Sequence, residues 1–383
     1  MKTNTVPTTL TLFNRITKNI KLVIRFVFLS LLITTCIRCN TPKKVKNLVE
    51  YEVETDSIDA FLASQMDSLN IHCLSFALIN GDKVVHHKTL GLANVEKKLP
   101  VTGKTIFEAA SMSKSIFSTL VMTYVEDGTL DLDKPLYEYF PHPDLLDDER
   151  HKKITARMIL SHRSGLPNWR ENEEGGKLRI KFDPGTNYEY SGEGYQYLAM
   201  VLKSILGGDW STLEAAFQER IAKPLGMTNT TFIENEDFLK LKAEPYDKQG
   251  NWIDWKNDYW YKKDKGRFVP AASVRSESLD FSKWMIGVMN KKILSEDSYG
   301  EILKKHSKTA TLSTGMSVYY ALGFLTLDKE YENIYIHGGI NDGFSCYYVM
   351  NMNNNVGFVV FTNSMQGERF GNIIWSYLEK QDK

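Results

Sequence analysis

The 383-residue chain is long enough for one large domain or two of ordinary size, and 42% hydrophobic residues with 12% aromatics are typical of a packed globular core. This content excludes disorder over most of the chain. Lys and Arg together number 47, as do Asp and Glu, so the chain has no net charge at pH 7 when its histidines are neutral. The balance argues against nucleic-acid binding, which needs a positively charged surface.

The first 49 residues differ from the rest because they hold nine Lys or Arg and no Asp or Glu. Basic residues here precede the apolar run "FVFLSLLITTCI", residues 26–37. Twelve residues are too few for a membrane-spanning helix, which needs about 20, but they fit the apolar region of an export signal. We therefore expect residues 1–39 to be an export signal of the lipoprotein type, and the polar, aperiodic residues 40–55 to be a linker.

Cys36 follows two small residues in "ITTC", which resembles the lipoprotein box in which a bacterial cysteine is lipidated. Two features weaken the match: Ile33 stands where leucine is usual, and Cys39, preceded by Arg38, is a second candidate. A lipid anchor at Cys36, a cleaved secretory signal and an uncleaved anchor all remain open. Each predicts an exported protein of the periplasm or cell envelope, and lipidation would attach it to a membrane.

The predicted elements fall into three groups along the chain. Strands are expected near both ends, helices at 57–67 and 372–380, and helical periodicity fills the middle. The fold class is therefore α/β (α+β): one antiparallel sheet built from both ends, flanked by terminal helices, with a mostly helical subdomain inserted. We expect a single domain over 56–383, with an α/β part at 56–110 and 270–383 and a helical subdomain at 111–269. The predicted strands are 73–79, 83–91, 333–339, 344–352 and 356–363, and the inserted helices are 114–128, 155–162, 194–206 and 213–226.

The stretch "EAASMSKSIFSTL" places Ser111 and Lys114 three residues apart where a helical period begins. Free N–H groups at a helix start favour developing negative charge, and Lys114 lies one turn later on the same face. If burial lowers the lysine pKa, Lys114 can take the serine proton. Taken alone, the pair fits an ordinary helix cap with a solvated lysine better than it fits a catalytic pair.

Two further motifs contain residues that could take part in catalysis. In "YEYSGEGYQYL", the phenol of Tyr190 beside a lysine ammonium would lose its proton more easily and become a general base. In "IYIHGGINDGF", His337 ends a strand, and Gly338 and Gly339 leave room for a substrate against the strand edge, with a nearby N–H for an oxyanion. A packed tyrosine and a glycine bulge are the alternative interpretations.

In this order the three motifs resemble the serine β-lactamase and penicillin-binding protein superfamily, in particular its class C β-lactamase, D,D-peptidase and esterase branch. The segments "MILSHRSGLP", "FDPGTNYEYSGEGYQYL", "KPLGMTNTTF" and "SVRSESLDFSKWM" are also similar to that branch, so the resemblance runs from about residue 56 to 380. It implies a β-lactamase/transpeptidase-like fold and an acyl-enzyme mechanism without metal or cofactor.

The resemblance also implies roles for individual residues. Ser111 attacks the carbonyl, Lys114 shares the proton, and Tyr190 is the general base and later the acid. The oxyanion lies between the backbone N–H groups of Ser111 and Ile340. His337 stands where β-lactamases usually keep a lysine and would face the pocket.

Two positions depart from the family pattern. Gly192 stands two residues after the tyrosine, where an asparagine often binds the substrate amide, so this substrate contact is in doubt. The His337-Gly338-Gly339 motif is more typical of esterases and D-amino-acid peptidases than of β-lactamases. We therefore expect a serine hydrolase acting on a small or peptidoglycan-derived ester or amide. A β-lactamase, or a cell-wall peptide or partner-binding protein with little turnover, is the alternative.

Some remaining features have simpler explanations. His162, beside Ser161, is expected to have a structural role in a turn, because the chain lacks the G-x-S-x-G nucleophile elbow. The aromatic stretch at 245–266, which includes Trp252, Trp255 and Trp260, predicts either a packed surface loop or a wall of the acyl pocket. Cys73 and Cys346 lie in apolar runs and are expected to be buried free thiols.

Overall fold

The computed structural model describes residues 43–328 and 333–380, which fall within one compact unit, Lys43–Lys383. The predicted export signal, 1–39, and both candidate lipidation residues, Cys36 and Cys39, lie outside the described residues. Within the described ranges, no helix is both long and apolar enough to cross a bilayer.

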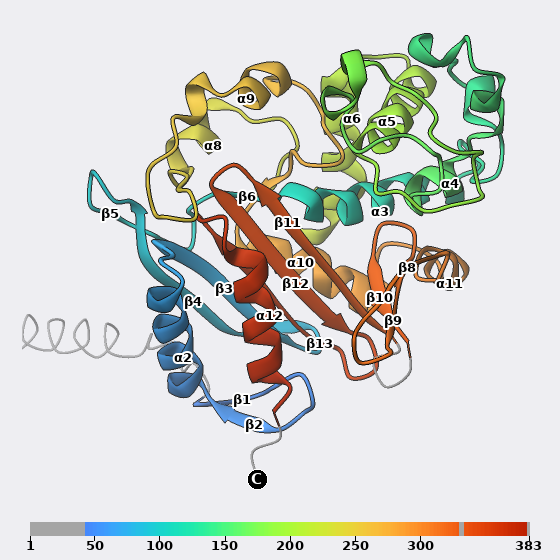
Figure 1. The fold of residues 1–383 in the computed structure, drawn as a ribbon. Helices are drawn as coiled ribbons and strands as arrows, with labels where there is room; N and C mark the ends of the chain where they lie inside the picture. Colours follow the sequence, from blue (N-terminus) through green and yellow to red (C-terminus); the bar gives the residue numbers. More distant parts are fainter. Residues whose placement is uncertain (1–42, 329–332, 381–383) are drawn as a thin grey trace, which may run out of the picture. The chain divides into compact units, whose positions relative to one another are not determined.

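A nine-stranded antiparallel sheet forms the centre of the described fold (Figure 1), with the strand order β5-β4-β3-β13-β12-β11-β10-β9-β8. Strand β3 near the start of the domain pairs with β13 near its end, in the register Phe76↔Val360. The predicted sheet built from both ends of the chain is therefore confirmed. Its strands are β3 Cys73–Asn80, β4 Lys83–Asn94, β5 Leu99–Pro100, β8 Ser307–Thr311, β9 Ser317–Tyr320, β10 Leu325–Leu327, β11 Ile334–Asn341, β12 Phe344–Asn351 and β13 Val356–Thr362.

The central strands are apolar without alternation because both faces of the sheet are covered. In β3, Phe76 and Leu78 pack into one hydrophobic core, whereas Ala77 and Ile79 pack into the other. Successive side chains of a strand point to opposite faces, so each strand feeds both cores. The core that contains Phe76 and Leu78 also holds the terminal helices α2 and α12, which lie over the same face of the sheet in Figure 1. The core on the other face, which contains Ala77 and Ile79, holds α10 and the inserted helices. The bounds are α2 Thr55–Ser68, α10 Ser278–Met289, α11 Glu296–Ile302 and α12 Gly367–Leu378.

The predicted helical insertion lies between two short strands, β6 and β7, which pair with each other. It therefore leaves and re-enters the sheet region at one place, close to the end of β11 (Figure 1). The elements are β6 Phe107–Glu108, η1 Ala110–Met112, α3 Ser113–Glu126, α4 Ala156–Leu160, α5 Gly192–Leu206, α6 Trp210–Phe217, the π-helical η7 Gln218–Ala222, α7 Lys223–Leu225, α8 Glu236–Leu241, α9 Tyr259–Asp264 and β7 Arg275–Ser276. Short 3₁₀ turns are η2 Leu136–Glu138, η3 Pro143–Leu145, η4 Glu149–Lys153, η5 Arg170–Asn172, η6 Glu174–Gly176 and η8 Trp255–Asn257.

The predicted linker at 40–55 differs from the structure. Strands β1, Lys44–Lys46, and β2, Glu52–Glu54, form a hairpin, and Val45 and Leu48 are buried in the core beneath α2 and α12. The Leu48 N–H also donates to the Leu378 carbonyl, 3.1 Å away, at the end of α12. Two apolar side chains among charged residues give no periodic signal, so the sequence pattern missed this docked hairpin.

Candidate active site

Ser111 lies in a tight turn between β6 and α3. Ser111 is the middle residue of the 3₁₀ turn η1, which leads directly into α3 at Ser113, so Ser111 precedes the α-helix instead of beginning it. Ala110, next to Ser111, has a left-handed backbone with φ of 43°, a conformation that costs a non-glycine residue roughly 1–2 kcal/mol. The turn is held by the Ala109 N–H, which donates to Val274 O at 2.8 Å, and by the Ser113 hydroxyl, which accepts from the Val274 N–H at 3.0 Å.

Lys114 points at the serine from a dry environment. Its Nζ lies 3.3 Å from Ser111 Oγ and donates to the Ala271 carbonyl at 2.9 Å, and the residue is only 1% exposed. Burial lowers the pKa of Lys114 to about 7, because an ammonium ion loses its hydration there. Near neutral pH a large fraction of Lys114 is therefore an uncharged amine within reach of the Ser111 proton.

Tyr190 lies beside the pair, but its ionisation differs from the sequence prediction. Burial raises the pKa of Tyr190 well above 10, and a hydrogen bond with the Ser111 side chain only partly opposes this rise. Lys114 Nζ lies 4.5 Å from the centroid of the Tyr190 ring, so it contacts the ring face. The expectation of a readily formed phenolate was wrong because desolvation outweighs the nearby lysine.

His162 packs behind Tyr190. Its ring centroid lies 4.3 Å from that of Tyr190, and its Nδ1 accepts a hydrogen bond from the Ser191 N–H at 3.0 Å. Burial and the Lys114 charge hold the pKa of His162 well below its usual value, so the imidazole is neutral. His162 also occupies the left-handed region, with φ of 58°. It therefore has a structural role in a turn, as predicted, and that turn is hydrogen-bonded to the separate segment that carries Tyr190.

His337 is buried in β11, where it is 3% exposed. Its Nδ1 contacts the Gly338 carbonyl at 2.6 Å, and its Nε2 lies 2.9 Å from the Tyr320 hydroxyl. Because a carbonyl can only accept, Nδ1 carries the proton and Nε2 accepts from Tyr320. Burial, aided by the Lys114 charge, lowers the pKa of His337 to about 3. His337 is thus neutral, and no positive charge replaces the lysine of the related motif.

Gly338 and Gly339 allow β11 to lie directly against the turn η1, which carries Ser111. A Cβ atom at Gly339 would lie 2.7 Å from the Ala109 carbonyl oxygen and 2.8 Å from the Ser111 amide nitrogen. Strand β10 pairs with β11 only as far as Ile336, so the edge of β11 beyond it has no partner on that side among the described strands. The segment from Gly338 to Ile340 therefore presents its backbone beside Ser111, where the predicted oxyanion N–H groups are needed.

Gly192 has no room for a side chain. A Cβ atom there would lie 2.8 Å from both the Asn168 carbonyl oxygen and the ring of Trp169. The Gly192 N–H instead donates to the Asn168 side chain at 3.0 Å. Gly192 is therefore a packing position for Trp169, and its predicted contact with substrate is not supported by the geometry.

Comparison with known proteins places these features in one family. The sequence profile of the Beta-lactamase family matches residues 58–382. The chain therefore belongs to the Beta-lactamase family. It is 24% identical to Protein flp of Staphylococcus aureus (strain MRSA252) over 325 residues, which cover 80% of this chain and 62% of that protein. A Beta-lactamase of Pseudomonas fluorescens is 27% identical over 203 residues, 50% of this chain and 55% of that protein.

Solved structures show the same fold. A class C beta-lactamase aligns with a TM-score of 0.71 and 18% identity over 86% of this chain and 97% of that chain. An octameric penicillin-binding protein homologue from Pyrococcus abyssi aligns with a TM-score of 0.69 and 21% identity over 82% and 74% of the two chains. The predicted superfamily and fold are thus confirmed. The chain spans 62% of the length of Protein flp, so activity is argued below from its own residues.

Two hollows of this Beta-lactamase family protein meet at Ile340. A cavity of about 370 Å³ extends from Ile340 under the insertion, and an open groove of about 660 Å³ extends from Ile340 along α12. Part of the aromatic stretch lines the cavity, whereas Trp252 is exposed and does not line it. The aromatic walls of the cavity are Trp169, Phe232, Trp255, Trp260 and Tyr261.

Sequence reasoning missed several partners of the site. Tyr320 holds His337, the Ala271 carbonyl holds Lys114, and Trp169 fills the space beside Gly192. None of these residues belongs to a motif with a fixed spacing from Ser111, because the fold brings them in from separate segments. The rule that buried polar atoms are hydrogen-bonded predicts that Lys114 and His337 have such partners, but it does not say which residues they are.

Proposed function

We propose that this protein is a serine hydrolase that cleaves an ester or amide through an acyl-enzyme on Ser111. The observation that carries the proposal is the contact between Lys114 Nζ and Ser111 Oγ at 3.3 Å, made by a lysine whose pKa burial lowers to about 7. A base with a pKa near the working pH is efficient, because much of it is unprotonated and it still accepts a proton well. A protein that only binds a ligand has no need of a desolvated lysine against a serine.

The proton path follows from the ionisation of the two neighbours. Lys114, as the neutral amine, takes the Ser111 proton as Oγ attacks the carbonyl carbon. Tyr190 stays protonated at neutral pH and hydrogen-bonds Ser111, so it is suited to pass a proton to the leaving oxygen or nitrogen. The N–H groups of Ser111 and Ile340 would bind the oxyanion, and water then releases the acyl group by the reverse sequence.

The chemistry around the serine favours a neutral ester or amide over a β-lactam. Penicillins carry a carboxylate and an acyl amide. The neutral, buried His337 offers no charge to a carboxylate, and Gly192 with Trp169 replaces the amide-binding side chain. A site whose polar partners are missing discriminates strongly against the ligand that needs them. An esterase or a peptidase is therefore our first choice, and a β-lactamase the second.

The aromatic cavity supports a preference for the acyl group. Five aromatic side chains line it, and it also contains Ile340, whose N–H would bind the oxyanion. Apolar or aromatic acyl groups would be stabilised there by about 25 cal/mol per Å² of buried apolar surface. The groove along α12 starts from the same residue and is available to the leaving group.

Export remains a separate proposal that rests on the sequence of residues 1–39. We propose delivery to the cell envelope, with Cys36 as the lipidated residue. Intact-mass spectrometry of the mature N-terminus from a membrane fraction tests this. A diacylglyceryl mass on Cys36 supports it, and an unmodified or uncleaved N-terminus contradicts it.

The central experiment is covalent labelling of the protein from residue 43 onward with a fluorophosphonate, a labelled penicillin and p-nitrophenyl esters. The Ser111→Ala variant should lose the fluorophosphonate adduct and ester turnover. Ser282→Ala is the matched control, because this buried hydroxyl donates to the Ser278 carbonyl of its own helix. Rapid penicillin turnover would favour the β-lactamase alternative. No Ser111-dependent adduct with any probe, in folded protein, would favour a binding protein.

A further inference from the structure

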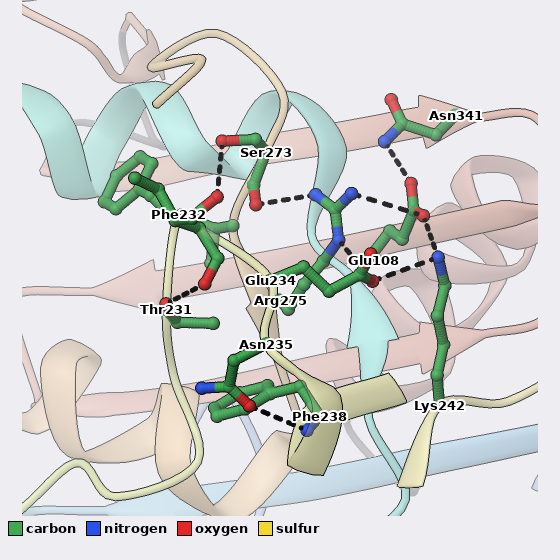
Figure 2. Close-up of polar contacts among 12 residues, drawn as sticks. Glu108, Thr231, Phe232, Glu234, Asn235, Phe238, Lys242, Ser273, Arg275 and Asn341 are labelled. Carbon is green, nitrogen blue, oxygen red and sulfur yellow. Dashed lines mark hydrogen bonds and ion pairs between the residues drawn. The ribbon is translucent and has the colours of Figure 1, made fainter. Parts of the chain in front are cut away.

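Three separate segments meet at the proposed oxyanion site. They are the end of β6 with the turn η1 that carries Ser111, the loop that precedes β7, and the end of β11. One side chain contacts the other two segments. Asn341 Nδ2 donates to Glu108 Oε2 at 2.6 Å (Figure 2). It also donates to the Ala272 carbonyl at 3.3 Å. Glu108 lies three residues before Ser111, and Ala272 follows the carbonyl that binds Lys114.

Glu108 is a buried carboxylate that two cations hold in place and keep ionised. Although burial alone would raise its pKa, Arg275 and Lys242 hold the pKa of Glu108 at about 2. Its Oε1 lies 2.7 Å from Lys242 Nζ and 3.6 Å from Arg275 (Figure 2). A carboxylate with two cations on one oxygen keeps the other oxygen free to accept from Asn341, and it stays ionised throughout the physiological pH range.

The two cations are themselves fixed. The Lys242 side chain is 2% exposed, its Nζ lies 3.3 Å from Glu234, and it lies over the ring of Trp255 at 4.1 Å from the centroid. The guanidinium of Arg275 donates to the Ser273 carbonyl at 2.6 Å and contacts Glu234 (Figure 2). Trp255 of the aromatic stretch therefore packs on this network, which forms part of the cavity wall.

We propose that Asn341 is a positioning residue of the oxyanion site, which through Glu108 fixes the N–H of Ile340 relative to Ser111. The inference rests on the proposed function, since it assigns a task to the same site. Ile340 and Asn341 are consecutive, so the tether of the Asn341 side chain restrains the backbone immediately after Ile340, one residue from the Ile340 N–H. An oxyanion donor must be placed to within a fraction of an ångström, and a 1 Å error can reduce the rate by about 10²-fold.

The need for such a tether is visible in β11. Beyond Ile336 the strand has lost its β10 neighbour, so among the described strands only β12 pairs with its last five residues. Gly338 and Gly339, which allow close approach to the Ser111 turn, also leave no side chains to pack the strand end. The Asn341 amide thus supplies a fixed point at the end of a locally unsupported edge.

The test is a charge-conserving exchange of the two partners, measured as kcat and KM on a p-nitrophenyl ester. Asn341→Asp places a carboxylate against Glu108, and Glu108→Gln removes the charge that orients the network. Each should lower kcat roughly 10- to 100-fold with a smaller change in KM. The double variant, Glu108→Gln with Asn341→Asp, keeps the total charge and restores the hydrogen bond between positions 108 and 341 in the opposite sense, from the introduced glutamine amide to the introduced aspartate carboxylate. It does not restore the bond to the Ala272 carbonyl. It should recover at least about ten-fold in kcat over the worse single variant.

A second measurement separates positioning from stability. An ester and its thionoester differ in how much they need oxyanion hydrogen bonds, so their rate ratio should fall in Asn341→Asp and return in the double variant. Asn351→Ala is the matched control: this buried amide on β12 bonds to the distant Leu48 carbonyl at 3.2 Å. It should lower the melting temperature and leave kcat and the rate ratio unchanged.

The outcomes are distinct. If wild-type protein forms no Ser111-dependent adduct, the proposed function fails. If the wild type reacts normally but the single variants keep their kcat, or the double variant shows the product of the two single losses, Asn341 has no positioning role. If Asn341→Asp unfolds, the double variant still decides, since it carries no excess charge.

Discussion

Lys114 Nζ lies 3.3 Å from Ser111 Oγ, and within the described part of the chain its hydrogen-bond partners are this hydroxyl and a backbone carbonyl. The pH dependence of acylation follows from this relationship. The base must be neutral, and burial puts its pKa at about 7, so kcat/KM should rise about ten-fold per pH unit below 7 and level off above. His337 and Tyr190 do not titrate between pH 5 and 9, because their pKa values lie outside that range.

The measurement is the rate of fluorophosphonate labelling from pH 5 to 9, because this step reports acylation without product release. Labelling of Ser111→Ala gives the background at each pH. A rate that is flat across this range, or that falls as pH rises through 7, would contradict a neutral Lys114 as the base.

Replacing Lys114 by Met should slow acylation strongly and stabilise the fold. Loss of the base should lower the labelling rate by roughly 10²–10⁴-fold. A lysine whose pKa is lower in the folded state binds fewer protons there than in the unfolded chain, so wild-type stability rises with pH between about 7 and 10.5. The stability advantage of Lys114→Met should therefore be largest below pH 7 and shrink by about 1.4 kcal/mol per pH unit above it.

Urea unfolding of both proteins at pH 6, 8 and 9.5 checks this sign. Lys283→Met is the control, because Lys283 is partly exposed and paired with Asp280. Its effect on stability should not grow or shrink in the same way. A Lys114→Met protein that is less stable than wild type at pH 6 would show that the lysine is held favourably as an ammonium ion.

The sequence predicted the components of the site better than their ionisation. Ser111, Lys114 and Tyr190 came from short motifs in a fixed order and from their resemblance to a known family, neither of which needs knowledge of the fold. The protonated Tyr190 and neutral His337 could not be predicted, because both depend on desolvation by residues from other segments. Apolar runs and helical periods likewise predicted the sheet and its insertion, since burial on two faces leaves a clear pattern. The β1–β2 hairpin, with only two buried apolar side chains, leaves no such pattern in the sequence.

His162 gives a prediction about the support of Tyr190. His162→Phe keeps an aromatic ring against Tyr190 but removes Nδ1, the acceptor for the buried Ser191 N–H. Leaving that donor unsatisfied should destabilise the fold by roughly 1–3 kcal/mol. Because Ser191 adjoins Tyr190, kcat should also fall, with the acylation pKa near 7 unchanged. Thermal unfolding and a pH–rate profile test both parts, and a shifted pKa would mean that His162 acts on Lys114 instead.

Trp260 gives a prediction about specificity. It lines the aromatic cavity and packs on Trp169, with ring centroids 5.6 Å apart, so Trp260→Ala should widen the acyl pocket. The ratio of kcat/KM for long or aromatic acyl esters to that for acetate should change by roughly ten-fold or more, since each methylene in an apolar pocket contributes about 1 kcal/mol.

Trp252 provides the matched control, because it belongs to the same stretch, is 47% exposed and does not line the cavity. Trp252→Ala should leave the acyl-length ranking unchanged. Trp255 is a poor choice for this purpose, since its ring contacts Lys242 and its loss would also disturb the Glu108 network. If folded Trp260→Ala protein ranks the esters as wild type does, the cavity does not receive the acyl group, and the groove along α12 becomes the place to test with the same ester series.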